Sequence, residues 1–154
     1  AIFTNAFRIH GAVMPYSESL LYSGYQYLNL TQIFMASIFI GASGAVLDLA
    51  VDITSAVYEV VQKKPDISWQ EAARSGMNVG RAAMGTMTTT LLLAYSGGYI
   101  ALLMVFMAQG TPIDHILNYK YVSAEILDTM VGSLGLVTVA PFTALTSGLL
   151  FGKK

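Results

Sequence analysis

Three long apolar stretches separate the polar parts of this chain, and they constrain its fold more than any other feature. They cover about residues 30–61, 82–107 and 121–151. Each is long enough to cross the bilayer, since roughly 20 helical residues span about 30 Å of hydrocarbon. Only 11% of the residues are charged, against about a quarter in soluble domains. The sequence therefore predicts an all-α integral membrane bundle of three transmembrane helices with short interfacial helices.

The connections between these stretches carry helix start and stop signals. Lys63-Lys64-Pro65 predicts the end of the first helix, because proline disfavours helical geometry in the preceding residue. Ser68-Trp69-Gln70-Glu71 has the pattern of a capping box. Thr111-Pro112-Ile113-Asp114 predicts the start of a short interfacial helix. We therefore divide the chain into an external or interfacial segment, residues 1–29, and a three-helix transmembrane domain, residues 30–154.

The basic residues predict the orientation of the chain. Those between the first two stretches and at the C-terminus are Lys63, Lys64, Arg74, Arg81, Lys153 and Lys154. The opposite side holds only Arg8 and Lys120. Because basic residues favour the cytoplasmic side, we expect a multipass protein of the cell membrane with its N-terminus outside and its C-terminus in the cytoplasm.

Acidic residues within the first stretch are the most informative chemical feature. Asp48 and Asp52 are one helical turn apart, and a charge at the membrane centre costs about 2.5–3.5 kcal/mol on insertion scales. Helical spacing places them on one face with Ser37, Gly41, Gly44, Ser55 and Glu59. Arg81 begins the second span at a similar depth. We predict an Asp52–Arg81 ion pair, with Asp48 nearer the middle of the membrane.

The third stretch carries its acids near the outer side. Glu125 and Asp128 share a helix face with two glycines, and we expect the polar faces of all three helices to line one interior. Pro141 is expected to kink this helix. The glycines predicted to mark close helix packing are Gly41, Gly44, Gly85, Gly132 and Gly135.

Several classes of function lack their sequence signals. The chain has no paired metal-binding histidines and no phosphate-binding loop, so we predict no enzymatic activity, no catalytic residues, no metal and no cofactor. It has no cysteine for disulfides or thiolate sites. A net charge of −1 gives no basic footprint for nucleic acid. The expected partners are the lipid bilayer and other membrane helices, supplied by upstream spans, by further copies or by partner subunits.

Motifs in all three stretches occur in the order of a known family. They are Gly41-Ala-Ser-Gly-Ala-Val-Leu-Asp48, Asp52-Ile-Thr-Ser-Ala-Val-Tyr-Glu59, Ser75-Gly-Met-Asn-Val-Gly-Arg81, Met84-Gly-Thr-Met-Thr-Thr-Thr90, Gly98, Ala124-Glu-Ile, Gly132-Ser-Leu-Gly-Leu-Val and Pro141. Over roughly residues 15–151 the chain resembles the C-terminal part of the YibE/F-like family of bacterial membrane proteins, whose members have further spans and an external domain upstream. The resemblance implies a permease-like multipass protein. Many relatives carry a small or neutral residue in place of Asp52, so the resemblance favours Asp48 as the functional acid.

Two functional hypotheses follow. The first is a permease-like protein or transporter subunit in which intramembrane acids couple solute movement to a proton or cation; its candidate residues are Asp48, Asp52, Arg81, Glu125 and Asp128. The second is a non-transporting scaffold or accessory subunit, in which the same charges form structural ion pairs and the glycines pack against partner helices.

Overall fold

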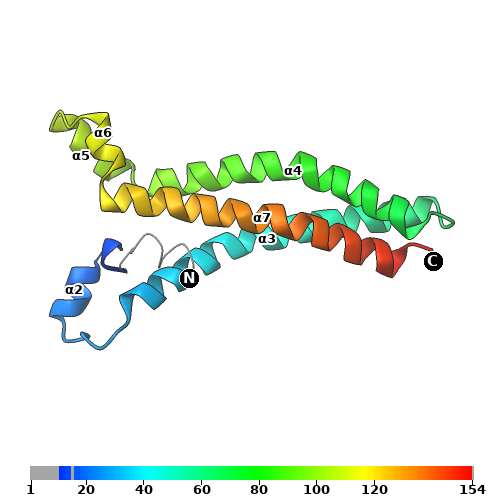
Figure 1. The fold of residues 1–154 in the computed structure, drawn as a ribbon, viewed down its shortest axis with the longest axis horizontal. Coiled ribbons are helices and arrows are strands. Elements are labelled where there is room, and N and C mark those ends of the chain that lie inside the picture. The colour runs from blue at the N-terminus through cyan, green and yellow to red at the C-terminus, as the bar shows by residue number, and fades with distance from the viewer. Residues whose placement is uncertain (1–10, 15, 154) are drawn as a thin grey trace.

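The computed structural model describes residues 11–14 and 16–153, whose secondary structure is helical (Figure 1). In chain order the elements are η1 (Gly11–Val13), α2 (Ser17–Tyr22), α3 (Leu30–Lys63), α4 (Trp69–Gly98), α5 (Ile100–Ala108), α6 (Ile113–Leu117) and α7 (Lys120–Phe151). The one β-type pairing within this part of the chain is an isolated bridge between Ser68 and Lys153. The prediction of an all-α protein is confirmed.

Helices α3, α4 and α7 lie side by side and form a long bundle (Figure 1). By length and composition, α3 and α7 are each able to cross a membrane. Helices α4 and α5 form a third span if the bent pair is taken as one. The short elements η1 and α2 lie near the N-terminal end of α3, and α5 and α6 project from the same end of the bundle (Figure 1).

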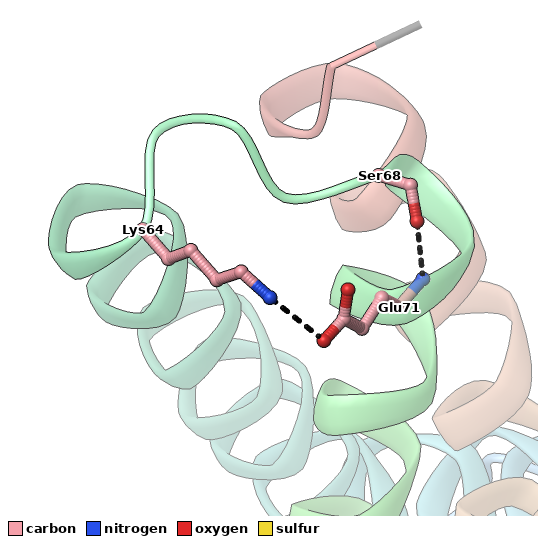
Figure 2. A network of polar contacts seen from close by, with 3 residues as sticks. All are labelled: Lys64, Ser68 and Glu71. Carbon is pink, nitrogen blue, oxygen red and sulfur yellow. Dashed lines mark hydrogen bonds and ion pairs between the residues drawn. The ribbon is translucent and has the colours of Figure 1, made fainter.

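The turn between α3 and α4 lies where the polar signals predict, and polar side chains cap the start of both helices. The Asn29 side chain accepts a hydrogen bond from the Gln32 backbone N–H, 3.1 Å away, at the start of α3. Ser68 accepts one from the Glu71 N–H at 3.3 Å, which caps α4 (Figure 2). The Glu71 carboxylate accepts from Lys64 Nζ at 3.1 Å (Figure 2). This ion pair therefore ties the start of α4 to the residue that follows α3.

The interior of the bundle is apolar and closely packed. Its fully buried side chains include Leu49, Ile53, Val57 and Leu136. Small residues allow this approach: a Cβ added at Gly80 would lie 2.8 Å from Ile53 Cδ1. Such contacts matter in lipid, where van der Waals packing takes the place of a hydrophobic force between helices.

The C-terminal end returns to the turn between α3 and α4. The Lys153 backbone N–H donates to the Ile67 carbonyl at 3.0 Å, and the Trp69 N–H donates to the Lys153 carbonyl at 3.1 Å. The Lys153 ammonium donates to the Asp66 carboxylate at 2.6 Å. Residues 66–69 and Lys153 therefore lie on the same side of any membrane that the bundle spans. The predicted N-terminal segment is described only in part, since residues 1–10 and 15 lie outside the described residues, as does Lys154.

The structure differs from the sequence prediction in the second span. Residues 82–107 form a single apolar stretch, but α4 ends at Gly98 and α5 leaves at an angle of 58°. The adjacent Gly97 and Gly98 account for the site of the break, because glycine is a poor residue for a helix interior. Helix α7, by contrast, continues through Pro141 as one helix.

Gly148→Ala is expected to destabilise the bundle. The added Cβ would lie 2.7 Å from both Ala73 Cβ and the Trp69 carbonyl oxygen, and backbone atoms have little freedom to move. Overpacking of this kind costs about 1–3 kcal/mol, measurable as a lower midpoint of thermal unfolding in detergent. Gly135→Ala on the same helix is the matched control, because its nearest contact would be an ordinary 3.6 Å to Val46 Cγ2. Equal stability of the two variants would contradict this packing.

Candidate functional site

Two acids on α7 lie opposite two tyrosines at the end of α4. Asp128 is buried, with 9% of its surface exposed, and Glu125 is half-buried. Tyr95 and Tyr99 are also half-buried and lie within electrostatic range of both carboxyl groups. The bend between α4 and α5 occurs beside this cluster. We call these four residues the α4–α7 cluster.

Helical spacing explains why the cluster assembles. Glu125 and Asp128 are three residues apart on α7, so they lie on one side of that helix, while Tyr95 lies in the last turn of α4 and Tyr99 at the break that follows it. Packing of Gly132 against Leu91, where an added Cβ would lie 2.6 Å from Leu91 Cδ2, sets the contact one turn further into the bundle. Asp128 therefore lies on the packed side of α7, and Glu125 lies nearer to its exposed side.

The hydrogen-bonding of the cluster is incomplete. Tyr99 lies close enough to Glu125 for the two side chains to interact electrostatically. Asp128 Oδ1 and the Tyr95 hydroxyl oxygen are buried, and neither has a partner among the described residues. Across residues 11–14 and 16–153, no Lys, Arg or His forms an ion pair with either acid. A buried polar atom without a partner costs about 1–3 kcal/mol, so the fold maintains this arrangement at a cost.

A small pocket lies against the cluster. It has a volume of about 100 Å³ and an almost wholly apolar surface, although Ser96, Tyr99, Glu125 and Thr129 are among the residues that border it. The Thr129 hydroxyl donates to the Glu125 backbone carbonyl at 3.1 Å, and the Ser96 hydroxyl donates to the Leu93 carbonyl at 3.2 Å. Both hydroxyls are thus engaged with their own helices, and the pocket itself offers almost no polar surface to a ligand.

The predicted site residues of the first two helices lie elsewhere. Asp48, Asp52 and Arg81 are all exposed on the surface of the bundle. The predicted ion pair between Asp52 and Arg81 is absent from the salt bridges of the described residues. The reason is angular: Gly80 faces Ile53 of α3, and its neighbour Arg81 is turned about 100° away around the helix. The three polar faces therefore do not meet in a common interior.

The five glycines predicted to pack also divide into two groups. Gly41, Gly132 and Gly135 lie against side chains of neighbouring helices, Tyr95, Leu91 and Val46 respectively. Around Gly44 and Gly85, an added Cβ would meet no described atom within 4 Å. These two glycines are therefore open on the surface of the chain.

A family model for YibE/F-like proteins matches residues 1–153. The chain belongs to the YibE/F-like family. Comparison with curated proteins and with solved structures gives no match. Family membership and the long apolar helices together indicate a membrane protein.

Sequence reasoning about this YibE/F-like chain found both acids of the α4–α7 cluster but not the importance of Tyr99. Two signals point to it. The Gly97-Gly98 pair is a helix-breaking feature inside an apolar stretch, and Tyr99 follows directly after it. Tyr99 also lies four residues after Tyr95, a spacing that would place both on one face of an unbroken helix.

Asp128→Asn is expected to leave the stability of this YibE/F-like protein unchanged or to raise it by about 1 kcal/mol. The amide has the same shape and removes a buried carboxylate that has no basic partner in the described chain. A buried ion-pair member would instead lose about 3–5 kcal/mol on neutralisation. Thermal unfolding in detergent measures the difference.

Asp66→Asn is the control for this comparison. It breaks an exposed ion pair with Lys153, and such surface pairs contribute about 0–1 kcal/mol. A large loss of stability in Asp128→Asn alone would mean that the carboxylate is held by a partner outside the described residues.

Proposed function

We propose that this YibE/F-like chain is a permease-like subunit that binds a proton or a small cation at the α4–α7 cluster, with no enzymatic activity. The observation that carries the proposal is Asp128, a buried carboxylate with an unpartnered oxygen, one turn from a second acid. Intramembrane acids generally mark ion pathways or proton relays because they are costly to keep in hydrocarbon.

The chemistry of the cluster restricts its ligand. Two carboxyl groups near each other cannot both remain charged in a low-dielectric site without a counter-charge. Either a proton or a cation supplies that charge. The adjoining pocket has an almost wholly apolar surface, so the carboxyl oxygens themselves would have to hold a cation, and carboxylate oxygens suit hard cations. Uptake and release of one positive charge is therefore the step that these residues are suited to perform.

The helix break supports the same proposal. Transporters commonly place their ion sites where a transmembrane helix is interrupted, because interrupted backbone and nearby polar side chains can bind an ion at membrane depth. Here α4 and α5 meet at 58°, next to Tyr99. A change in this angle would move Tyr99 relative to Glu125 on α7 and so alter access to the pocket.

The scaffold hypothesis has one observation in its favour. Asp48, Asp52 and the open Gly44 all lie on the exposed surface of α3, where partner helices would bind. A scaffold needs no buried acid, however, so the two hypotheses differ in what they require of Asp128. Assembly and ion binding also involve different faces of the chain, so both can hold.

Proteoliposomes containing the chain are expected to conduct protons or to exchange protons for a cation. The measurement is the response of an internal pH dye after an imposed pH gradient, with potassium and valinomycin controlling the membrane potential. Asp128→Asn is expected to lower the flux to that of protein-free vesicles, because the amide cannot exchange a proton. Glu125→Gln is expected to lower the flux less, since Glu125 is only half-buried whereas Asp128 is buried.

Asp114→Asn is the matched control for the flux assay. Its side chain is 73% exposed, in α6 and away from the spans, so its loss leaves the proposed pathway intact. Flux that persists in Asp128→Asn at the wild-type rate would refute the proposed site, and absence of flux in the wild-type chain under every cation gradient would favour the scaffold.

We also propose that the C-terminus and the α3–α4 turn lie in the cytoplasm, which rests on the excess of basic residues there. Single cysteines report this directly because the chain has none. In intact cells an impermeant thiol reagent is expected to label Gln109→Cys, at the exposed end of α5, and to leave Lys153→Cys unlabelled until the cells are opened. The reverse labelling pattern would invert the topology.

A further inference from the structure

The exposed face of α3 carries charges that have no partner among the described residues. Asp48 and Asp52 lie near the middle of this 34-residue helix and are exposed. Neither makes a hydrogen bond or an ion pair with any described residue. Gly44, one turn before Asp48, is open in the same way. We call this the acidic row.

Helix α4 carries a complementary row of the opposite charge. Arg74 and Arg81 are exposed, as are Asn78 and Gly85 on the same face. No ion pair within residues 11–14 and 16–153 involves either arginine. Gly85, one turn after Arg81, has open space around it. We call this the basic row.

The two rows lie at the same depth along the bundle. Ile53 lies against both Gly76 and Gly80, with an added Cβ 3.3 Å from Ile53 Cγ2 at Gly76 and 2.8 Å from Ile53 Cδ1 at Gly80. Asp52 and Arg81 are the sequence neighbours of Ile53 and Gly80, so they are level with each other. They remain apart because they point outward from different sides of the bundle.

From these rows we infer that copies of this chain pack side by side in the membrane, with the acidic row of one copy against the basic row of the next. Copies inserted in the same orientation keep Asp52 and Arg81 at matching depth, so each pair can form between chains although it does not form within one. Gly44 and Gly85 flank the charges and let the two backbones approach. Lipid cannot solvate the charges of either row, because charged side chains within the bilayer are costly. The inference does not depend on the proposed function.

The contact is heterologous, since it joins two different surfaces of the same protein. Such contacts form closed rings when the rotation between neighbours allows closure. Within one membrane, copies of one orientation are related by rotation about the membrane normal, which favours closure. An isologous dimer would instead bring the acidic row against itself, with like charges opposed.

Cysteine cross-linking in native-like membranes tests this arrangement, using the absence of native cysteine. Ser55 is three residues after Asp52 and Asn78 is three residues before Arg81 on the antiparallel helix, so Ser55→Cys and Asn78→Cys should be level. Both side chains are exposed. Copper phenanthroline is expected to produce a covalent dimer when the two variants are co-expressed, but not with either alone. The double variant on one chain should give a ladder of larger species.

Other cross-linking patterns would overturn the inference. A dimer from Ser55→Cys alone would indicate an isologous contact, and the absence of any cross-link in the mixture would mean that something other than a second copy covers these rows. Both substitutions are conservative and lie on the surface, so the experiment is informative even where charge variants fail to insert.

Charge reversal supplies the second test. In the cross-linking background, Asp52→Arg is expected to reduce the covalent dimer by about tenfold, because it places two cations together at depth. Combining Asp52→Arg with Arg81→Asp restores opposite charges and is expected to recover the cross-link. Asp114→Arg, on the exposed surface of α6, is the control that should leave it unchanged. Failure of the double reversal to recover the dimer, with the protein inserted, would argue against the pair.

Discussion

Close contact between α3, α4 and α7 at small residues is the interaction on which the rest of this structure depends. In lipid, apolar side chains gain little by leaving one apolar surrounding for another, so helices must associate through packing and polar contacts. Gly76, Gly80 and Gly148 leave no room for a Cβ against the neighbouring helices. That proximity sets the depth and rotation of each helix, and with them the positions of every charged side chain.

The rotation of the helices separates the intramembrane charges into two environments. Helix α7 turns Asp128 inward toward Tyr95 and the bend after Gly98, whereas α3 turns Asp48 and Asp52 outward. The inward acids lie near Tyr95 and Tyr99 and beside a small, almost wholly apolar pocket. The outward acids have open glycines beside them and no described partner. Acids of the same type therefore differ in what they can do.

Much of the fold was predictable from the sequence because it depends on one-dimensional signals. Hydropathy located α3 and α7, and Pro65 and Ser68 marked the ends of α3 and α4, since these effects act within a turn or two of helix. The depth of each residue along its helix was predictable as well, because the rise per residue is constant. The rotation of each helix about its own axis was not predictable. Whether Arg81 reaches Asp52 depends on which face of α4 contacts α3, and Gly80 decides that through its contact with Ile53. The bend at Gly98 was also missed, because an apolar stretch is predicted as one continuous helix even where its glycines favour a break.

Because the two groups of acids lie apart, the proposed ion site is separate from the surfaces proposed for assembly. If the outward acids were the ion site, neutralising them would change flux and association together. All four residues of the α4–α7 cluster come from one chain, whereas the acidic and basic rows find their partners only between chains. Each copy would then carry its own site, and the ring would fix the neighbouring α3 and α4 surfaces around it. Helix α7 contributes most of its exposed apolar side chains, among them Val137, Phe142 and Leu150, to the surface that remains for lipid. The polar faces are thereby used for association, and the apolar face stays in contact with the bilayer.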